Sequence, residues 1–157
     1  MLRPQGALTK GEADMAYDAP TLMKMSEAEL DALFTSSPPG DIPSGEGKGT
    51  AILAPGTSFT APIAQLINHF AWQGKIFDPE KGVLRNLILP FGFSAVIAKV
   101  YKGTSWLDGK DCIVLDYSET SVVAHWIRDE IRLIQPKTYL GKVYWDKARL
   151  FHFLLEF

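Results

Sequence analysis

The feature that most constrains this chain is the composition of its second part, from Trp72 onwards. Short runs of β-branched and aromatic residues alternate there with turns rich in Gly, Asp and Pro. Residues of the first kind favour strands, and short turns between strands force neighbours to pair antiparallel. Seven or eight such strands usually close on themselves, because closure removes unpaired edges. The sequence therefore predicts a mainly β fold, an antiparallel β-barrel.

We expect a short strand at residues 50–54 and seven further strands after it. Two hairpin turns are the best defined. Asp108-Gly109 has the left-handed backbone preference of a tight turn, and Asp146-Lys147 lies between two clear strand patterns. The seven predicted strands cover residues 72–77, 82–89, 94–101, 111–117, 122–134, 139–145 and 150–157.

Two short α-helices are expected before the barrel. Ser26 and Glu29 form a capping-box pattern, and the apolar positions that follow predict a helix through about residue 35. Pro62 begins a second helical pattern, whose apolar stripe continues to Phe70. Residues 1–20 lack any periodicity and are predicted to be a flexible arm, which leaves residues 21–157 as a single barrel domain. The glycine-rich segment 45–50 lacks the spacing of a phosphate loop, and we expect a flexible turn there.

Composition and charge exclude several classes of function. A net charge of −2, from 16 basic and 18 acidic residues, argues against a nucleic-acid partner. The chain contains no apolar run of the ~20 residues that a membrane span needs, and no secretory signal pattern. Cys112 is the single cysteine, so we expect no disulfide, a buried and inert thiol, and a cytoplasmic location. The three histidines lack metal-ligand spacing, and we predict neither a metal nor another cofactor.

The predicted strand at 122–134 is the most informative segment for function. Strand alternation divides its side chains into an apolar face, expected to point inward, and a polar face. His125 and Asp129 fall on the apolar face, where burial is costly unless they are paired. The apolar face consists of Val123, His125, Ile127, Asp129, Ile131 and Leu133, and the polar face of Ala124, Trp126, Arg128, Glu130 and Arg132.

His125 and Asp129 are therefore candidates for binding the polar group of a ligand or, in an enzyme, for moving a proton. A purely structural pair, or a register shifted by one residue, explains the same pattern. For the opposite face we expect a solvated surface with modest ion pairs. A β-bulge would instead turn Arg128 inward, where its planar guanidinium would suit a carboxylate, so it stays a candidate ligand-binding residue.

Five other residues complete the predicted ligand-binding set. The strand at 111–117 is apolar on both faces, so it should be covered on both sides. Either Asp116 or Tyr117 would then point into the interior near the strand's end, although a turn-capping role is common for an Asp at that place. The other three candidates are aromatic side chains or a histidine in apolar surroundings, namely Trp72, Tyr144 and His152.

Three segments carry a resemblance to a known family. They are Trp-Gln-Gly-Lys-Ile-Phe at 72–77, Gly-Lys-Val-Tyr-Trp at 141–145 and the closing Phe-His-Phe-Leu-Leu-Glu-Phe at 151–157. Together they resemble small bacterial lipocalin-like proteins, calycin-type β-barrels that are largely uncharacterised. The resemblance covers about the C-terminal half of the chain. It implies a barrel that binds fatty acids, terpenoids, polyketides or similar apolar molecules.

The leading hypothesis is therefore an intracellular protein that binds a hydrophobic small molecule in its barrel. An alternative is a cofactor-independent isomerase or cyclase of the same shape, in which His125 or Asp129 transfers a proton. A third reading is a structural domain whose aromatic side chains form a homodimer interface. An enclosed cavity lined by the two candidates would favour the first two hypotheses.

Overall fold

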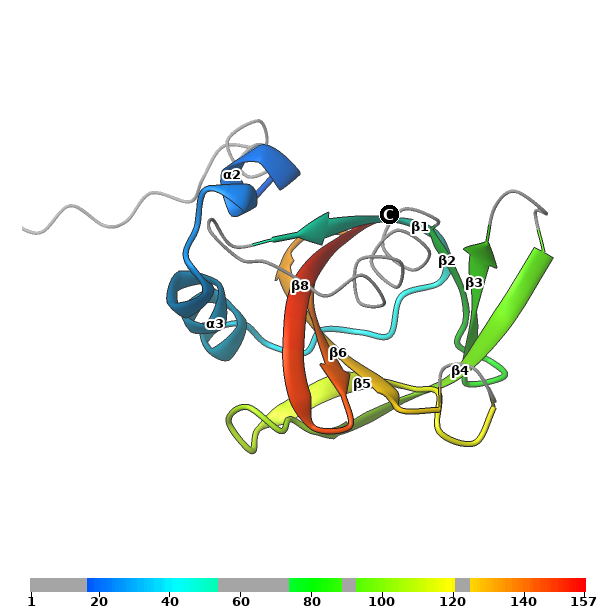
Figure 1. Cartoon of the computed structure of the whole chain (residues 1–157). Coiled ribbons are helices and arrows are strands. Elements are labelled where there is room, and N and C mark those ends of the chain that lie inside the picture. Colours follow the sequence, from blue (N-terminus) through cyan, green and yellow to red (C-terminus); the bar gives the residue numbers. More distant parts are fainter. Residues whose placement is uncertain (1–16, 54–73, 89–92, 121–124) are drawn as a thin grey trace, which may run out of the picture.

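The computed structural model describes residues 17–53, 74–88, 93–120 and 125–157. Two helices, α2 (Ala19–Met23) and α3 (Glu27–Ser36), precede eight strands (Figure 1). The strands are β1 (Gly45–Ile52), β2 (Lys75–Asp78), β3 (Val83–Ile88), β4 (Phe93–Thr104), β5 (Asp111–Asp116), β6 (Ile127–Gln135), β7 (Thr138–Trp145) and β8 (Ala148–Glu156).

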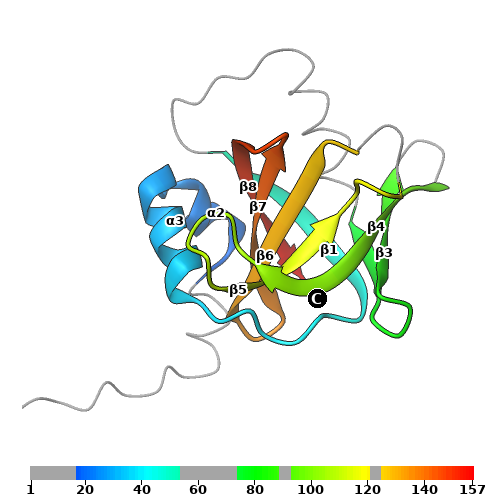
Figure 2. The same ribbon diagram turned by 90° about the horizontal axis from the view of Figure 1, so that it is seen from below.

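The eight strands form one closed antiparallel barrel in sequence order, which confirms the predicted fold class. The barrel closes at β1, whose two halves pair with different strands. Its first part pairs with β2, and its second part, from Lys48 to Ile52, pairs with β8. Figure 2 shows the helices on one side of the barrel and β3 and β4 on the other.

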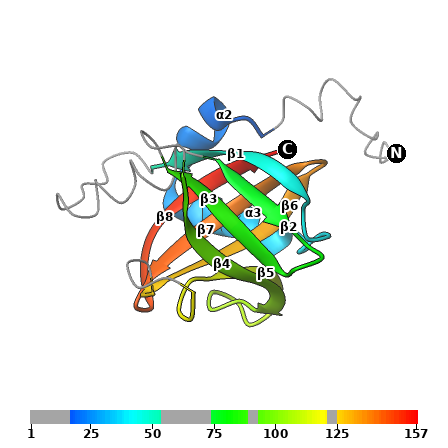
Figure 3. The same cartoon turned by 90° about the vertical axis from the view of Figure 1, so that its right-hand side faces the viewer.

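Two apolar cores lie on opposite sides of the barrel wall. The first fills the barrel interior, and the second joins α2 and α3 to the outside of the wall. With β3 and β4 turned to the viewer, α3 lies behind the barrel (Figure 3). The outer core contains Leu22, Leu30 and Phe34 from the helices, together with Ile52, Cys112, Val114, Leu140 and Leu154 from the strands. As predicted, β5 is thus covered on both faces.

The helix predicted from the capping box is present as α3. The Ser26 hydroxyl accepts from the Glu29 amide, and the Glu29 carboxylate accepts from the Ser26 amide. Helix α2 was not predicted, because five residues are too few for periodicity to be recognised; Asp18 caps it. The helix predicted at 62–70 lies outside the described residues. Neither described helix has the length and apolar content to cross a membrane.

Two sequence predictions about strands were wrong. The glycine-rich segment at 45–50 is not a turn but the start of β1. A glycine is required at Gly47 because a Cβ there would lie 2.6 Å from the ring of Phe157. The strand predicted at 122–134 begins only at Ile127, so His125 lies in a turn before β6. Both predicted hairpin turns are present. Gly109 has the expected positive φ, and Asp146 and Lys147 also adopt positive φ.

Candidate functional site

A cluster of four polar side chains lies inside the barrel, surrounded by the apolar inner core. The Lys75 ammonium donates to Asn86 Oδ1 at 2.5 Å and to the Tyr117 hydroxyl at 3.0 Å. The Asn86 amide also donates to the Tyr117 hydroxyl, at 2.9 Å. Asp129 is more distant, with Oδ2 3.5 Å from the Tyr117 hydroxyl and 3.8 Å from Lys75 Nζ. We call these four residues the inner cluster.

Strand alternation places each member of the inner cluster among apolar neighbours. Lys75 shares its face of β2 with Phe77, and Asp129 lies between two buried isoleucines of β6. Tyr117 follows directly after β5, and its side chain is fully buried. The cluster therefore combines side chains from β2, β3 and β6 with one from the end of β5.

Burial changes the proton affinity of these groups. It raises the pKa of the Asp129 carboxyl to about 6, against the opposing effect of the nearby Lys75 ammonium. The same burial lowers the pKa of Lys75, with Asp129 again opposing the shift. The Tyr117 hydroxyl has its pKa raised well above the usual value and stays protonated. Burial thus shifts the pKa values of Asp129 and Lys75 towards each other.

One polar atom of the inner cluster is unsatisfied. Asp129 Oδ1 is buried and has no hydrogen-bond partner among the described residues. Leaving a buried carboxylate oxygen without a donor costs on the order of 1–3 kcal/mol or more. Such an atom is rare in a folded interior.

The two ends of the barrel differ. At the end where β8 finishes, the ring of Phe157 lies 5.5 Å from the ring of Phe77 and 5.8 Å from that of Tyr139, both edge to face. These three rings pack together at that end of the interior. The inner cluster lies toward the opposite end, since Lys75 begins β2 and Tyr117 follows the last residue of β5.

The structure brings together two of the predicted site residues, Asp129 and Tyr117. Asp116 instead accepts from the Ser118 amide and from the Tyr101 hydroxyl, so it stabilises the turn, whereas Tyr117 points inward. His125 is half-buried, with its ring 4.2 Å from that of Trp126. The described partners of Asp129 are Lys75 and Tyr117, so the predicted pairing of Asp129 with His125 is not among its described contacts. Trp72 lies outside the described residues.

Arg128, Tyr144 and His152 lie on the outside of the barrel wall. The Arg128 guanidinium lies over the Trp106 ring, 4.4 Å from its centre, so no bulge turns it inward. The Tyr144 ring packs edge to face against the same Trp106, beside an open surface pocket of about 590 Å³ that both residues line. His152 Nε2 lies 3.1 Å from an Asp31 carboxylate oxygen beneath α3.

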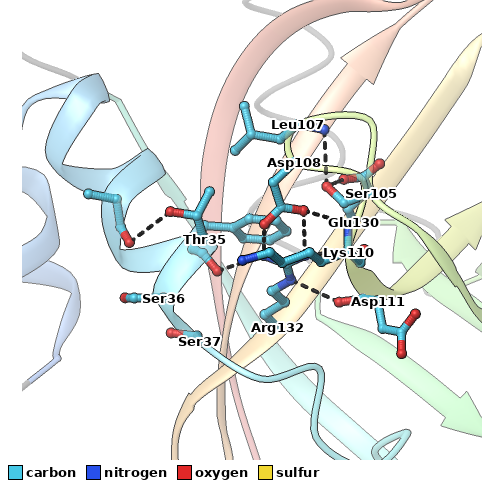
Figure 4. Close-up of polar contacts among 12 residues, drawn as sticks. Thr35, Ser36, Ser37, Ser105, Leu107, Asp108, Lys110, Asp111, Glu130 and Arg132 are labelled. Atoms are coloured by element: carbon cyan, nitrogen blue, oxygen red, sulfur yellow. Dashed lines mark hydrogen bonds and ion pairs between the residues drawn. The ribbon is translucent and has the colours of Figure 1, made fainter.

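The outer face of β6 is buried, which contradicts the predicted solvated surface. The Arg132 guanidinium donates to both carboxylate oxygens of Asp108, at 2.7 and 2.8 Å, and to the backbone oxygens of Phe34, Lys110 and Asp111 (Figure 4). Glu130 is fully buried beside it. The reason is that α3 and the loop after β4 cover this face. We call Arg132 and its hydrogen-bond acceptors the outer cluster; the acceptors are Asp108, Phe34, Lys110 and Asp111.

Lys75 and Asn86 were missed by the sequence analysis. Both lie on short strands, of four and six residues, where alternation is too brief to reveal the inward face. Lys75 does belong to the Trp-Gln-Gly-Lys-Ile-Phe segment on which the family resemblance was based. A lysine two positions before a buried phenylalanine was the only signal available.

The fold and the inner cluster define a class, that of small closed antiparallel barrels with a buried polar centre. No protein-family model matches the chain, and neither does any curated protein. Among solved structures, the chain is similar to the crystal structure of a protein from Thermomonospora curvata, with a TM-score of 0.63 and 15% sequence identity. The match covers 94% of this chain and 98% of that one. At this identity the likeness shows the fold alone.

Proposed function

We propose that the barrel binds a hydrophobic small molecule, of the fatty acid, terpenoid or polyketide kind, whose polar group contacts the inner cluster. The observation that carries the proposal is Asp129, a buried carboxylate with one unpartnered oxygen and its nearest cation 3.8 Å away. Burying a charge in an apolar interior costs free energy that close pairing normally offsets. Here the pairing is incomplete, and a ligand's hydrogen-bond donor would complete it.

The surroundings of the cluster favour an apolar ligand body. The inner core consists almost entirely of aliphatic and aromatic side chains, and binding sites of this kind hold few polar groups in a mostly apolar lining. Three aromatic rings pack together around Phe157 at the far end of the barrel, away from the inner cluster. The buried, reduced Cys112 supports an intracellular location for this binding protein.

Displacement of a fluorescent apolar dye tests this proposal. Dodecanol, dodecanoic acid and farnesol are each titrated against the dye on the wild-type protein, and native mass spectrometry of protein purified from its own host seeks a copurified apolar molecule. The test variant combines Lys75→Met with Asp129→Val, which keeps the interior apolar and free of unpaired charge. We expect the best ligand to bind it about 10 to 100 times more weakly, for loss of one charge-assisted contact.

A control variant carries Lys102→Met, the same change at an exposed position of β4. Its affinity should equal that of the wild type. Failure of all three compounds to displace the dye, or equal affinity for the test variant, would refute the proposal.

A second candidate function is proton transfer on such a ligand, as in an isomerase or cyclase. It is favoured by Asp129, whose pKa of about 6 lies close to working pH and whose neighbour Tyr117 stays protonated. An apolar ketone incubated with the protein in heavy water should then exchange its α-hydrogens for deuterium. Asp129→Asn should abolish this exchange while leaving ketone binding within about tenfold. Equal exchange by the variant would rule out this role.

A further inference from the structure

Lys75 differs from the other buried lysine of the barrel. Lys142 Nζ lies 2.6 Å from an Asp31 carboxylate oxygen, and Arg149 also pairs with that carboxylate. Lys75 Nζ contacts two neutral oxygens, of Asn86 and Tyr117, and its carboxylate is 3.8 Å away. Burial lowers the pKa of both lysines, that of Lys142 to about 8, but only Lys142 has a carboxylate oxygen within hydrogen-bond distance.

The rest of the environment of Lys75 is apolar. Its Nζ lies 5.7 Å from the centre of the Phe153 ring, and its side chain is 4% exposed. Phe153 lies directly over Gly141, where a Cβ would come within 2.2 Å of the ring, so the ring lies close against the barrel wall. A desolvated amine in such surroundings is the form of lysine that enzymes and binding proteins use as a nucleophile.

We propose that Lys75 forms a reversible covalent imine with an apolar aldehyde or ketone held in the barrel. This inference rests on the proposed function, and it names the polar group of the ligand as a carbonyl. The neutral amine is available because burial lowers the pKa of Lys75. Asn86 and Tyr117 fix the position of Nζ through their hydrogen bonds.

The reaction balances without an oxidant or a further reagent. The Nζ lone pair attacks the carbonyl carbon, and a C–N bond forms as the carbonyl oxygen takes up a proton. A second proton transfer to that oxygen releases it as water, while the nitrogen loses its protons to give the C=N bond. Asp129 carries protons in these steps, since its carboxyl accepts and releases them near neutral pH.

Asp129 has a further role once the imine has formed. A protonated imine carries a positive charge at the place of the former ammonium, and the Asp129 carboxylate lies 3.8 Å from that nitrogen. It is the nearest described counter-ion. The Phe153 ring adds a favourable cation–π contact at a longer distance.

Reductive trapping tests the inference on the full chain. Decanal and sodium cyanoborohydride are added to wild-type protein, and the modified lysines are identified by peptide mass spectrometry. We expect one decyl group per chain on Lys75, at least ten times faster than on Lys142 or on any exposed lysine. The polar glyceraldehyde should show no such preference. Labelling spread over exposed lysines, or equal preference with glyceraldehyde, would overturn the inference.

Two variants act as controls in the trapping experiment. The Lys75→Met, Asp129→Val double variant should lose the fast modification, and Lys102→Met should retain it. If the double variant fails to fold, the position of the label on the wild-type protein still decides the outcome. Fast modification of a correctly folded double variant would count against Lys75.

Decanol separates this inference from the proposed function, because an alcohol cannot form an imine. If decanol displaces the dye but decanal leaves Lys75 unmodified, the covalent step is wrong and the binding function stands. If neither decanol nor decanal binds, both are wrong. With cinnamaldehyde, a protonated conjugated imine should absorb at longer wavelength than the free aldehyde, and Asp129→Asn should weaken that band at pH 7; an unchanged band would contradict the counter-ion role.

Discussion

The inner and outer clusters are both buried and both built around one cation, yet they differ in how well that cation is paired. Arg132 donates to five oxygen atoms, including both carboxylate oxygens of Asp108, at 2.7 to 3.3 Å. Lys75 has two hydrogen bonds to neutral groups, and Asp129 keeps one oxygen without a partner. The cation of the outer cluster is thus fully paired, whereas the inner cluster keeps one carboxylate oxygen without a described partner.

This difference in pairing is matched by a difference in the pKa of the two carboxyl groups. Arg132 belongs to β6, and its guanidinium contacts the last turn of α3 and the loop after β4. It therefore holds these three elements together. Its hydrogen bonds hold the pKa of Asp108 down at about 2. In the inner cluster burial dominates and moves the pKa of Asp129 upward, which is typical of groups that bind or react.

The largest effect is expected from Arg132→Met. The change removes all five hydrogen bonds and leaves the Asp108 carboxylate without its cation. We expect the free energy of unfolding in urea to fall by about 3 to 5 kcal/mol. Arg85→Met, at an exposed position of β3, should change it by less than about 0.5 kcal/mol. A loss below about 1 kcal/mol for Arg132→Met would mean that the outer cluster does not stabilise the fold.

A smaller and opposite effect is expected from the Lys75→Met, Asp129→Val double variant. Replacing a buried, poorly paired ion pair by apolar side chains is often neutral or stabilising by about 1 to 4 kcal/mol. Asn86 and Tyr117 keep their mutual hydrogen bond in this variant. We therefore expect unchanged or higher stability in urea, together with ligand binding about 10 to 100 times weaker than that of the wild type. If the double variant loses more than about 2 kcal/mol, the inner cluster is structural like the outer one.

The smallest effect concerns the pH dependence of stability. Asp129, inside the barrel wall, and His152, outside it, should contribute to this dependence with opposite signs. The pKa of Asp129 is raised to about 6 on folding, so the folded state binds its proton more tightly and this contribution to stability falls as pH rises from about 4 to 6. Burial, with help from Lys142, lowers the pKa of His152 to about 3. Its contribution is therefore lost as pH falls from about 6.5 towards 3.

Two single variants separate these contributions. Between pH 6.5 and 4.5, Asp129→Asn should increase the loss of stability on acidification by about 2 kcal/mol, because the opposing gain disappears. His152→Gln should decrease that loss by about 2 kcal/mol, while its amide can still donate to Asp31. Urea unfolding at several pH values measures both slopes. Parallel slopes for both variants and the wild type would contradict the assigned pKa directions.

Much of the barrel could be predicted because strand alternation and turn residues act locally. The inward positions Ile127, Asp129 and Ile131 follow from alternation alone, and the turn at Asp146-Lys147 follows from its neighbours. The covered outer face could not be predicted in this way. Its burial depends on α3, which lies almost a hundred residues before Arg132 in sequence.

The candidate site was predicted only in part, for a similar reason. Asp129 and Tyr117 were recognised because each belongs to a strand pattern that is clear by itself. The start of β6 is decided by its partner, since Ile127 pairs with Trp145 of β7 and the Trp126 carbonyl accepts from the Asp146 amide. His125 was therefore assigned to a strand that local pattern extended too far.

The division of β1 between two neighbours has a consequence for how the chain folds. Lys48 pairs with Glu156, so the seam joins the first strand to the last. Every other pairing in the barrel links strands that are consecutive in the sequence. Until β8 docks at the seam, β1 and β8 each present an edge of unpaired amides and carbonyls on which a second molecule could pair. Docking of β8 is thus the slow, long-range step and the period of greatest risk of aggregation.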